Sequence, residues 1–254
     1  MAAVDREGVA IHYEVHGEGD GTPLLLTHGF GSSSAMWGPN LESLSRGRRV
    51  AAWDLRGHGS SDAPDDPAAY SHDASVGDMA AVLDAAGLSR AVLVGMSLGG
   101  YLSQRFRLAH PERVAGLVLV DTGPGYRRDD ERARWNDYCE QVAADLEARG
   151  LAAQRESSEV ALAHHRHGAQ GLAYAARGIM AQRDAAVIEA LEAIDVPALV
   201  VVGAEDEQFL RAAGYMASRI PGARQVVIEG AGHAANVDQP AAFDRAVGEF
   251  LEGL

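Results

Sequence analysis

The 254-residue sequence contains no lysine and only one cysteine, Cys139. Its 22 basic residues are all arginine, and with 36 aspartate and glutamate residues they give a formal net charge of −14 at pH 7. A single cysteine excludes a disulfide scaffold within the chain. Nucleic acid and anionic membranes repel an acidic surface, so we expect neither as a partner.

Long hydrophobic runs are missing as well. No apolar stretch approaches the roughly 20 residues that a membrane-spanning helix needs. The first 20 residues carry several charged side chains and lack the apolar segment of a signal peptide. We therefore expect a cytoplasmic protein whose thiol is reduced.

Short apolar runs alternate with stretches of helical periodicity. The runs predict strands at residues 9–15, 24–27, 50–55, 91–96, 116–120, 198–202 and 225–228. Continuous runs of valine and leucine are typical of strands covered on both faces. Helices are predicted at residues 76–86, 98–109, 209–220 and 241–251. This alternation predicts an α/β fold, with a mostly parallel central sheet and helices on both faces.

The alternation breaks once, between residues 123 and 194. This segment is rich in alanine, glutamate and arginine, and it contains no convincing strand. We interpret residues 1–122 and 195–254 as the core and residues 123–194 as an inserted helical cap. Because the insertion follows a strand end, where open α/β sheets bind ligands, we expect the cap to cover the active site.

The strongest chemical signal is Ser97, which lies between glycines in the segment 95–100 (Gly-Met-Ser-Leu-Gly-Gly). The segment follows a predicted strand and opens a predicted helix. Such a sharp turn exposes the serine hydroxyl, and the helix N-terminus favours developing negative charge there. The sequence therefore predicts that Ser97 is a nucleophile.

A serine nucleophile needs a base and an acid that orients the base. Of the ten histidines, only His233 follows a strand end with flanking glycines. Asp206, after the strand at 198–202, is the favoured acid. Asp121 and Glu205, which is next to Asp206 in the sequence, are competing candidates for the acid, although we expect Glu205 to point away.

The remaining candidates are oxyanion donors, other histidines and side chains of the substrate pocket. The backbone N–H groups of Phe30 and Leu98 are the predicted oxyanion donors. His12 and His16 are expected at the surface. His164, His165 and His167 are interpreted as a solvated helix face rather than as metal ligands, and no metal or cofactor is expected. Six side chains are candidates for the substrate pocket: Met96, Trp37, Trp135, Tyr138, Tyr174 and Met180.

Taken together, these segments resemble the α/β-hydrolase superfamily. The resemblance covers nearly the whole chain and rests on residues 28–31, 54–61, 95–100, 203–206 and 230–233. The chain order Ser97, Asp206, His233 matches the family's order. Within the superfamily, residues 97–100 and 233–240 are similar to segments of bacterial esterases and enol-lactonases.

The resemblance implies a serine hydrolase that cleaves a small carboxylic ester or lactone through an acyl-enzyme. The same triad could instead serve C–C bond hydrolysis, perhydrolysis of the haloperoxidase type or thioester hydrolysis. A protein of this fold that binds a small ligand without turnover is a further alternative. The natural substrate and the oligomeric state stay open.

Overall fold

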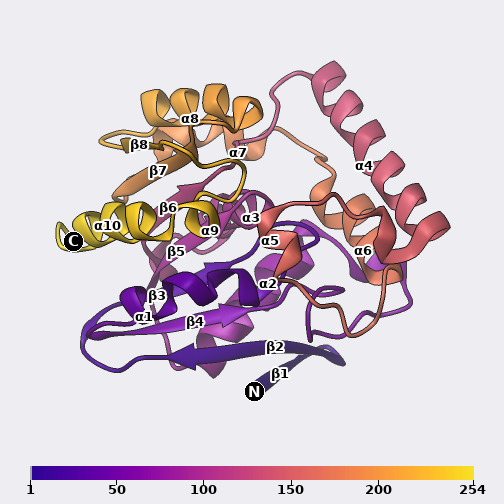
Figure 1. Cartoon of the computed structure of the whole chain (residues 1–254), viewed down its shortest axis with the longest axis horizontal. Coiled ribbons are helices and arrows are strands. Elements are labelled where there is room, and N and C mark those ends of the chain that lie inside the picture. The colour runs from indigo at the N-terminus through magenta and orange to yellow at the C-terminus, as the bar shows by residue number, and fades with distance from the viewer. Residues whose placement is uncertain (1) are drawn as a thin grey trace.

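The computed structural model describes residues 2–254, which contain one eight-stranded sheet (Figure 1). Its strands are β1 (Ala2–Arg6), β2 (Val9–His16), β3 (Gly21–Thr27), β4 (Arg48–Trp53), β5 (Ala91–Met96), β6 (Val114–Val120), β7 (Ala198–Gly203) and β8 (Arg224–Ile228). They lie in the order β1-β2-β4-β3-β5-β6-β7-β8. The β1–β2 and β2–β4 pairs are antiparallel and the other five are parallel, which confirms the predicted sheet.

Helices cover both faces of the sheet. One face packs against α1 (Gly38–Leu44), α9 (Ala235–Asp238) and α10 (Pro240–Leu251), and the other against α2 (His72–Ala85), α3 (Leu98–Ala109) and α8 (Glu207–Arg219). Short 3-10 turns are η1 (Ser34–Trp37), η2 (Pro67–Ala69) and η3 (Pro111–Arg113). The fold therefore has three layers, with the sheet in the middle.

Strand β5 shows why the central strands are continuously apolar. All six of its residues are buried. Leu93 belongs to the hydrophobic cluster on one face, whereas Val92 and Val94 belong to the cluster on the other. Successive side chains of a strand point to opposite faces, so a strand covered twice needs apolar residues at every position.

Residues 121–197, all of which the structure describes, contain helices and loops but no strand. The helical elements are α4 (Asp129–Arg149), η4 (Gly150–Ala153), α5 (Ser158–Ala161), α6 (Gln170–Ala175), the π-helical turn η5 (Ala176–Met180), α7 (Ala186–Glu189) and η6 (Leu191–Ala193). Cys139 and Leu146 of α4 are buried in the same hydrophobic cluster as Leu93 of the sheet. The segment therefore packs onto the core as one hydrophobic unit.

Strand β1 and helix α1 are among the elements that were absent from the sequence-based prediction. Strand β1 lies at the edge of the sheet, where only partial burial leaves a weak alternation. Helix α1 is short and begins with Gly38 and Pro39, neither of which favours a helix interior. Its formation depends on packing, since Leu44 of α1 is buried against the sheet.

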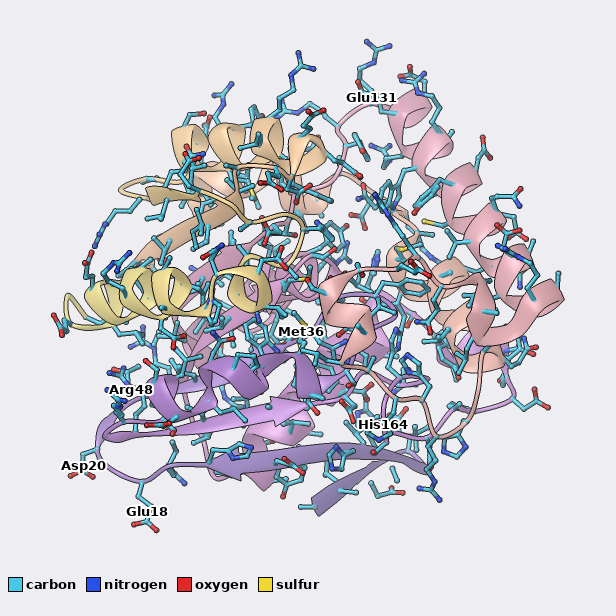
Figure 2. All side chains as sticks on the ribbon, in the orientation of Figure 1. Glu18, Asp20, Met36, Arg48, Glu131 and His164 are labelled. Carbon is cyan, nitrogen blue, oxygen red and sulfur yellow. The ribbon has the colours of Figure 1, made fainter. Side chains whose placement is uncertain are left out.

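The polar surface agrees with the acidic composition. Glu18 and Asp20 project from the turn between β2 and β3, whereas Met36 lies inside the molecule (Figure 2). Among residues 2–254, no helix combines the length and the apolar composition that crossing a bilayer requires.

Candidate active site

Ser97 occupies a strained turn between β5 and α3. Its backbone lies at φ 52° and ψ −115°, a conformation that residues other than glycine rarely adopt. The Ser97 N–H donates to the carbonyl of Val120 at 2.9 Å, and Thr122 Oγ1 donates to the Ser97 carbonyl at 2.6 Å. These bonds to the end of β6 hold the serine in its unusual conformation.

The neighbouring glycines permit this turn because the chain comes very close to itself. A Cβ atom on Gly95 would lie 2.6 Å from the backbone nitrogen of Gly100. A Cβ atom on Gly99 would overlap the carbonyl oxygen of Thr27 and lie 2.7 Å from that of His28. Any side chain at these positions would therefore push α3 away from β3 and β5.

His233 and Asp206 complete a hydrogen-bonded chain with Ser97. His233 Nε2 lies 3.0 Å from Ser97 Oγ, and His233 Nδ1 lies 2.8 Å from Asp206 Oδ2. The serine follows β5, the aspartate follows β7 and the histidine follows β8. All three strands run parallel, so their carboxyl ends bring residues distant in sequence to one edge of the sheet.

The surroundings of His233 tune its basicity. Burial alone would lower the pKa of His233, but the hydrogen bond and the charge of Asp206 outweigh this effect. The charges of Asp121 and Glu159 act in the same direction, and the pKa rises above its ordinary value. The ring also stacks on Phe209, with centroids 5.0 Å apart, so its orientation is held from two sides.

Asp121 does not contact His233 by a hydrogen bond in this arrangement. Its buried carboxylate accepts the N–H of Gly203 at 2.8 Å and the N–H of Ala235 at 2.9 Å. Burial raises the pKa of Asp121 to about 7. Asp121 thus ties the loops that carry Asp206 and His233, while Glu205 lies exposed at the rim of the cavity.

The loop at residues 28–31 lies directly against the serine. A Cβ atom on Gly29 would lie 3.3 Å from Ser97 Cβ. His28 is buried, its Nδ1 lies 2.7 Å from the Gly29 carbonyl, and its Nε2 accepts the N–H of Leu55. Burial lowers the pKa of His28 to about 4, which keeps the ring neutral in this structural role. The N–H of Leu98 is the first of α3 and has no acceptor within that helix.

A cavity of about 790 Å³ opens above Ser97 and His233. Core and cap both line it: Phe30, Met96 and Phe209 come from the core, and Trp135 and Met180 from residues 123–194. Trp135 Nε1 donates to the Met180 carbonyl at 2.9 Å, which fixes this part of the wall. The cavity is large enough for a small organic substrate.

Of the six candidate pocket residues, Met96, Trp135, Tyr138 and Met180 line the cavity, but Trp37 and Tyr174 do not. The prediction for these two was wrong. Trp37 is fully buried on the face of the sheet that α1, α9 and α10 cover. Its ring centroid lies 6.2 Å from that of Phe243. Tyr174 packs against Tyr70, 5.5 Å away. Trp37 therefore fills the interior, whereas Tyr174 is half-buried and its hydroxyl donates to Asp65 near the surface.

Several lining residues could not be found from the sequence. Gln154, Glu159 and Val160 come from the irregular part of the cap around α5, and Asp238 comes from α9. No motif marks these positions, and the cap has no regular periodicity there. Only the path of the chain across the strand ends brings them over Ser97.

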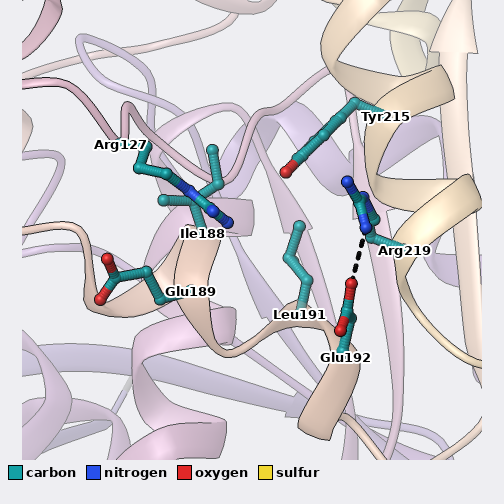
Figure 3. Close-up of a pocket in the computed structure, with 7 residues that line it drawn as sticks. All are labelled: Arg127, Ile188, Glu189, Leu191, Glu192, Tyr215 and Arg219. Carbon is teal, nitrogen blue, oxygen red and sulfur yellow. Dashed lines mark hydrogen bonds and ion pairs between the residues drawn. The ribbon is translucent and has the colours of Figure 1, made fainter.

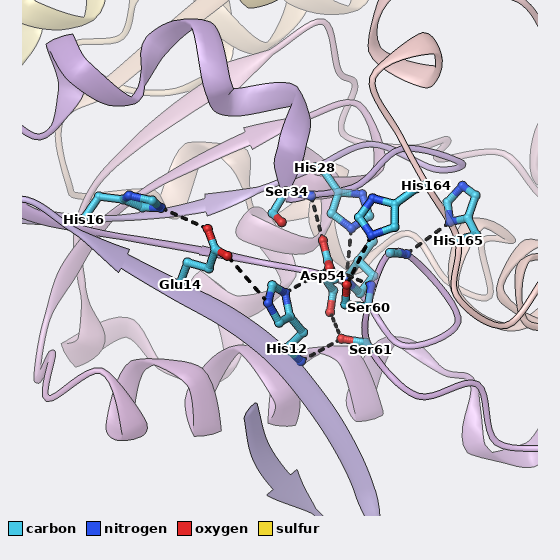
Figure 4. A network of polar contacts seen from close by, with 12 residues as sticks. His12, Glu14, His16, His28, Ser34, Asp54, Ser60, Ser61, His164 and His165 are labelled. Atoms are coloured by element: carbon cyan, nitrogen blue, oxygen red, sulfur yellow. Dashed lines mark hydrogen bonds and ion pairs between the residues drawn. The ribbon is translucent and has the colours of Figure 1, made fainter. Parts of the chain in front are cut away.

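The interpretation of His12 as a surface residue was also wrong. His12 is buried, and its Nδ1 lies 3.1 Å from Asp54 Oδ2 (Figure 4). Asp54 further accepts the N–H groups of Ser34 at 2.7 Å and Ser60 at 2.9 Å. Burial alone would raise the pKa of Asp54, but these hydrogen bonds lower it well below its ordinary value. This network joins β2 to the loops after β3 and β4.

The histidines of the cap do not form a helix face. His164 and His165 lie in the loop between α5 and α6 (Figure 4). His165 Nδ1 accepts the N–H of Gly59 at 3.1 Å, and its Nε2 lies 3.0 Å from the Gly31 carbonyl. These contacts anchor the cap to the core. Within residues 2–254, no group of three histidine, cysteine or acidic side chains could hold a metal ion.

A second pocket of about 260 Å³ lies near α7, η6 and α8 and shares no lining residue with the first (Figure 3). Arg127, Tyr215 and Arg219 contribute to its wall. Arg219 is paired with Glu192 at 2.7 Å. The lining residues of this second pocket include no serine, cysteine or histidine.

The mostly parallel sheet is covered on both faces and carries a serine, an acid and a histidine at its carboxyl edge, and this combination defines an α/β-hydrolase. Residues 22–240 match the family model of the alpha/beta hydrolase fold. The chain belongs to this family, and the resemblance seen in the sequence is confirmed.

Two relatives match nearly the whole length of the chain. The chain is 31% identical to a Bacillus subtilis protein named as a 2-succinyl-6-hydroxy-2,4-cyclohexadiene-1-carboxylate synthase, over 96% of each chain. It is 34% identical to a protein of Variovorax paradoxus named as the carbamate hydrolase RutD, over 95% of this chain and 96% of the other.

Among solved structures, an enol-lactonase from Burkholderia xenovorans has a TM-score of 0.80 and 26% identity, over 99% of this chain and 100% of its own. A thermophilic esterase from Thermogutta terrifontis has a TM-score of 0.83 and 28% identity, over 99% and 96%. These similarities support hydrolytic activity as the general function of the chain.

Proposed function

We propose that the protein is a serine hydrolase that cleaves a small carboxylic ester or lactone through an acyl-enzyme. The observation that carries this proposal is the chain of hydrogen bonds from Ser97 Oγ through His233 to Asp206, at 3.0 and 2.8 Å, on the floor of a cavity. The similarity to an enol-lactonase and to an esterase supports the choice of bond.

In the first half of the reaction, Ser97 Oγ attacks the substrate carbonyl while His233 Nε2 takes its proton. Asp206 holds Nδ1–H and stabilises the imidazolium that forms. The backbone N–H groups of Phe30 and Leu98 receive the developing oxyanion, each contributing about 3 kcal/mol of transition-state stabilisation. His233 then protonates the leaving alcohol.

In the second half, water attacks the acyl-enzyme. His233 accepts a proton from the water, and Ser97 leaves with that proton returned to its oxygen. In a lactone the alcohol and the acid belong to one molecule, so a single hydroxy acid is released. The mechanism uses no metal and no cofactor, because charge and proton transfer are handled by side chains and backbone amides.

The test is hydrolysis of a p-nitrophenyl ester series from acetate to long acyl chains. We expect Ser97→Ala to lower kcat by about 10⁴-fold or more, because the nucleophile is lost. Ser218→Ala, which changes an exposed serine of α8, serves as the matched control. If wild type is inert to every ester and a fluorophosphonate probe does not label Ser97, the proposal is wrong.

Carbamate hydrolysis is a second candidate, favoured by the similarity to the protein named as a carbamate hydrolase. The same nucleophile and oxyanion donors would act on the carbamate carbonyl, with an amine as leaving group. Release of ammonia from a simple carbamate, compared with alcohol release from an ester of equal size, separates the two. Product analysis on diketone, thioester and peroxide substrates separates the remaining reactions of this triad.

A further inference from the structure

Glu159, in the cap helix α5, is a buried carboxylate on the wall of the cavity. Only 6% of the residue is exposed to solvent. Ser157 Oγ donates to Glu159 Oε1 at 2.8 Å. One carboxylate oxygen therefore has a hydrogen-bond partner close by in the sequence, at the start of the helix. The other oxygen, Oε2, is buried and has no hydrogen-bond partner among the residues that the structure describes.

An unpartnered carboxylate oxygen is costly in a protein interior. A buried charged group without hydrogen bonds loses the solvation that it has in water, so such oxygens normally meet a donor. The residues around Glu159 Oε2 supply none. A donor brought by the substrate would remove this cost only when the site is occupied, so the unpaired oxygen favours substrates that carry one.

Glu159 is held against the loop that follows β3. Its backbone carbonyl accepts Ser32 Oγ at 3.0 Å, and Gln154 Nε2 donates to the Gly31 carbonyl at 2.8 Å. Both contacts join the cap to the loop that follows β3. The carboxylate is also close enough to His233 that its charge contributes to the raised pKa of that ring. Glu159 therefore shares one enclosed space with the catalytic groups.

Most of the charged side chains that line the cavity are acidic. Seven acidic residues line it, namely Asp145, Glu156, Glu159, Glu205, Asp206, Glu207 and Asp238. Arg155 is the single arginine among the lining residues. Such a lining disfavours anionic substrates and raises the local concentration of cations. The apolar walls formed by Phe30, Trp135 and Phe209 accommodate the hydrocarbon part of a ligand.

We propose that the substrate carries a protonated amine, which forms a charge-assisted hydrogen bond with the Glu159 carboxylate while Ser97 attacks the ester carbonyl. This inference rests on the proposed hydrolase function and adds the substrate class to it. A cationic ester is bound by the carboxylate, and an ester with a free carboxylate is rejected by it.

The test compares butyrate esters that differ in charge at one position. The 2-(dimethylamino)ethyl ester is protonated at neutral pH, the 3-methylbutyl ester is its neutral isostere, and the 3-carboxypropyl ester is anionic. We expect wild type to favour the cationic over the neutral ester by about ten- to hundredfold in kcat/KM, which is typical of a hydrogen bond to a charged group. The anionic ester should be the poorest substrate.

Glu159→Gln keeps the volume of the side chain and removes its charge. We expect this substitution to bring the ratio of kcat/KM between the cationic and the neutral ester close to one, mainly through KM for the cationic ester. Asp137→Asn removes the same charge from an exposed position of α4 outside the cavity, and it should leave the ratio unchanged. An equal drop in both variants would overturn the inference, because only the overall charge of the cap would matter.

Binding without turnover separates the two proposals. The Ser97→Ala variant is titrated calorimetrically with the cationic ester, alone and combined with Glu159→Gln. We expect the double variant to bind at least tenfold more weakly. Equal affinities overturn the role of Glu159, whether or not the wild type hydrolyses esters. If the neutral ester is not hydrolysed in a Ser97-dependent way, the proposed hydrolase function fails instead.

Discussion

At the scale of single residues, the site depends on how the environment changes the proton affinity of side chains. His233 must be neutral to accept the proton of Ser97, whereas its bond to Asp206 and the nearby negative charges favour the protonated ring. Asp121 shows the opposite balance, because burial raises its pKa to about 7 although it accepts two backbone N–H groups. The two acids near His233 therefore have different roles.

The raised pKa of His233 predicts the pH profile. Protonation inactivates the base, so kcat/KM should fall as the pH drops through the His233 pKa, at a midpoint above the ordinary value of 6.5. Replacing Asp206 with Asn removes the partner that raises this pKa, so the midpoint should shift to lower pH while kcat falls by about 10⁴-fold. The measurement is kcat/KM against pH with a neutral p-nitrophenyl ester. An unchanged midpoint in Asp206→Asn would contradict this assignment.

At the scale of elements, the turn between β5 and α3 determines where the reactive serine lies. The turn is possible because glycines allow α3 to approach the carbonyls at the end of β3. Sequence periodicity predicts both flanking elements and the turn between them. The same periodicity leaves α1 and β1 undetected, since these elements form through packing against the sheet or pairing at its edge.

Gly99→Ala should disrupt this turn. The added methyl group would meet backbone atoms of Thr27 and His28, which cannot move away as a flexible side chain could. We expect a loss of about 1–3 kcal/mol in the free energy of unfolding and a severe loss of esterase activity. Chemical denaturation and the p-nitrophenyl assay measure the two effects.

Gly214→Ala is the matched control in α8, where a Cβ atom would meet nothing within 4 Å. Alanine favours the helix over glycine, so this variant should gain about 0.5–1 kcal/mol of stability and keep its activity. Similar destabilisation in both variants would show that the close approach at Gly99 is not the cause.

At the scale of the whole molecule, buried polar networks join parts of the chain that hydrophobic packing alone does not align. Asp54 joins β2 to two loops, and Arg56 forms two hydrogen bonds with the buried carboxylate of Asp78 in α2, at 2.8 and 2.7 Å. His165 extends the same region to the cap. The loop that contains Phe30 is therefore held by contacts from the core and from the cap.

The Asp54–His12 pair predicts how stability depends on pH. The pKa of Asp54 is lowered in the folded state, so its contribution to stability is present above the ordinary value of 3.8 and is lost as the pH falls through the folded-state pKa. The pKa of His12 is raised, so its contribution is present below 6.5 and is lost as the pH rises through the folded-state value. The pair should contribute most between these two pH values.

Urea unfolding of wild type and Asp54→Asn at acidic, mildly acidic and alkaline pH checks this expectation. The difference in the free energy of unfolding should be largest near pH 5 and shrink in both directions. Asp20→Asn, at the exposed turn between β2 and β3, is the control for the loss of one negative charge. A difference that does not change with pH would contradict the role of the ion pair.

The class of fold, the serine turn and the chain order of Ser97, Asp206 and His233 could all be predicted from the amino-acid sequence. These features depend on local patterns, namely apolar runs, helical periodicity and glycines at fixed spacing, and local patterns are written directly in the order of residues. Asp206 was favoured over Asp121 as the partner of His233, and the folded structure shows that contact. The burial of His12 and Trp37 and the position of Glu159 in the cavity are visible only in the folded structure. Each of these depends on how segments from different strands and loops pack together in three dimensions, and no local pattern specifies such contacts.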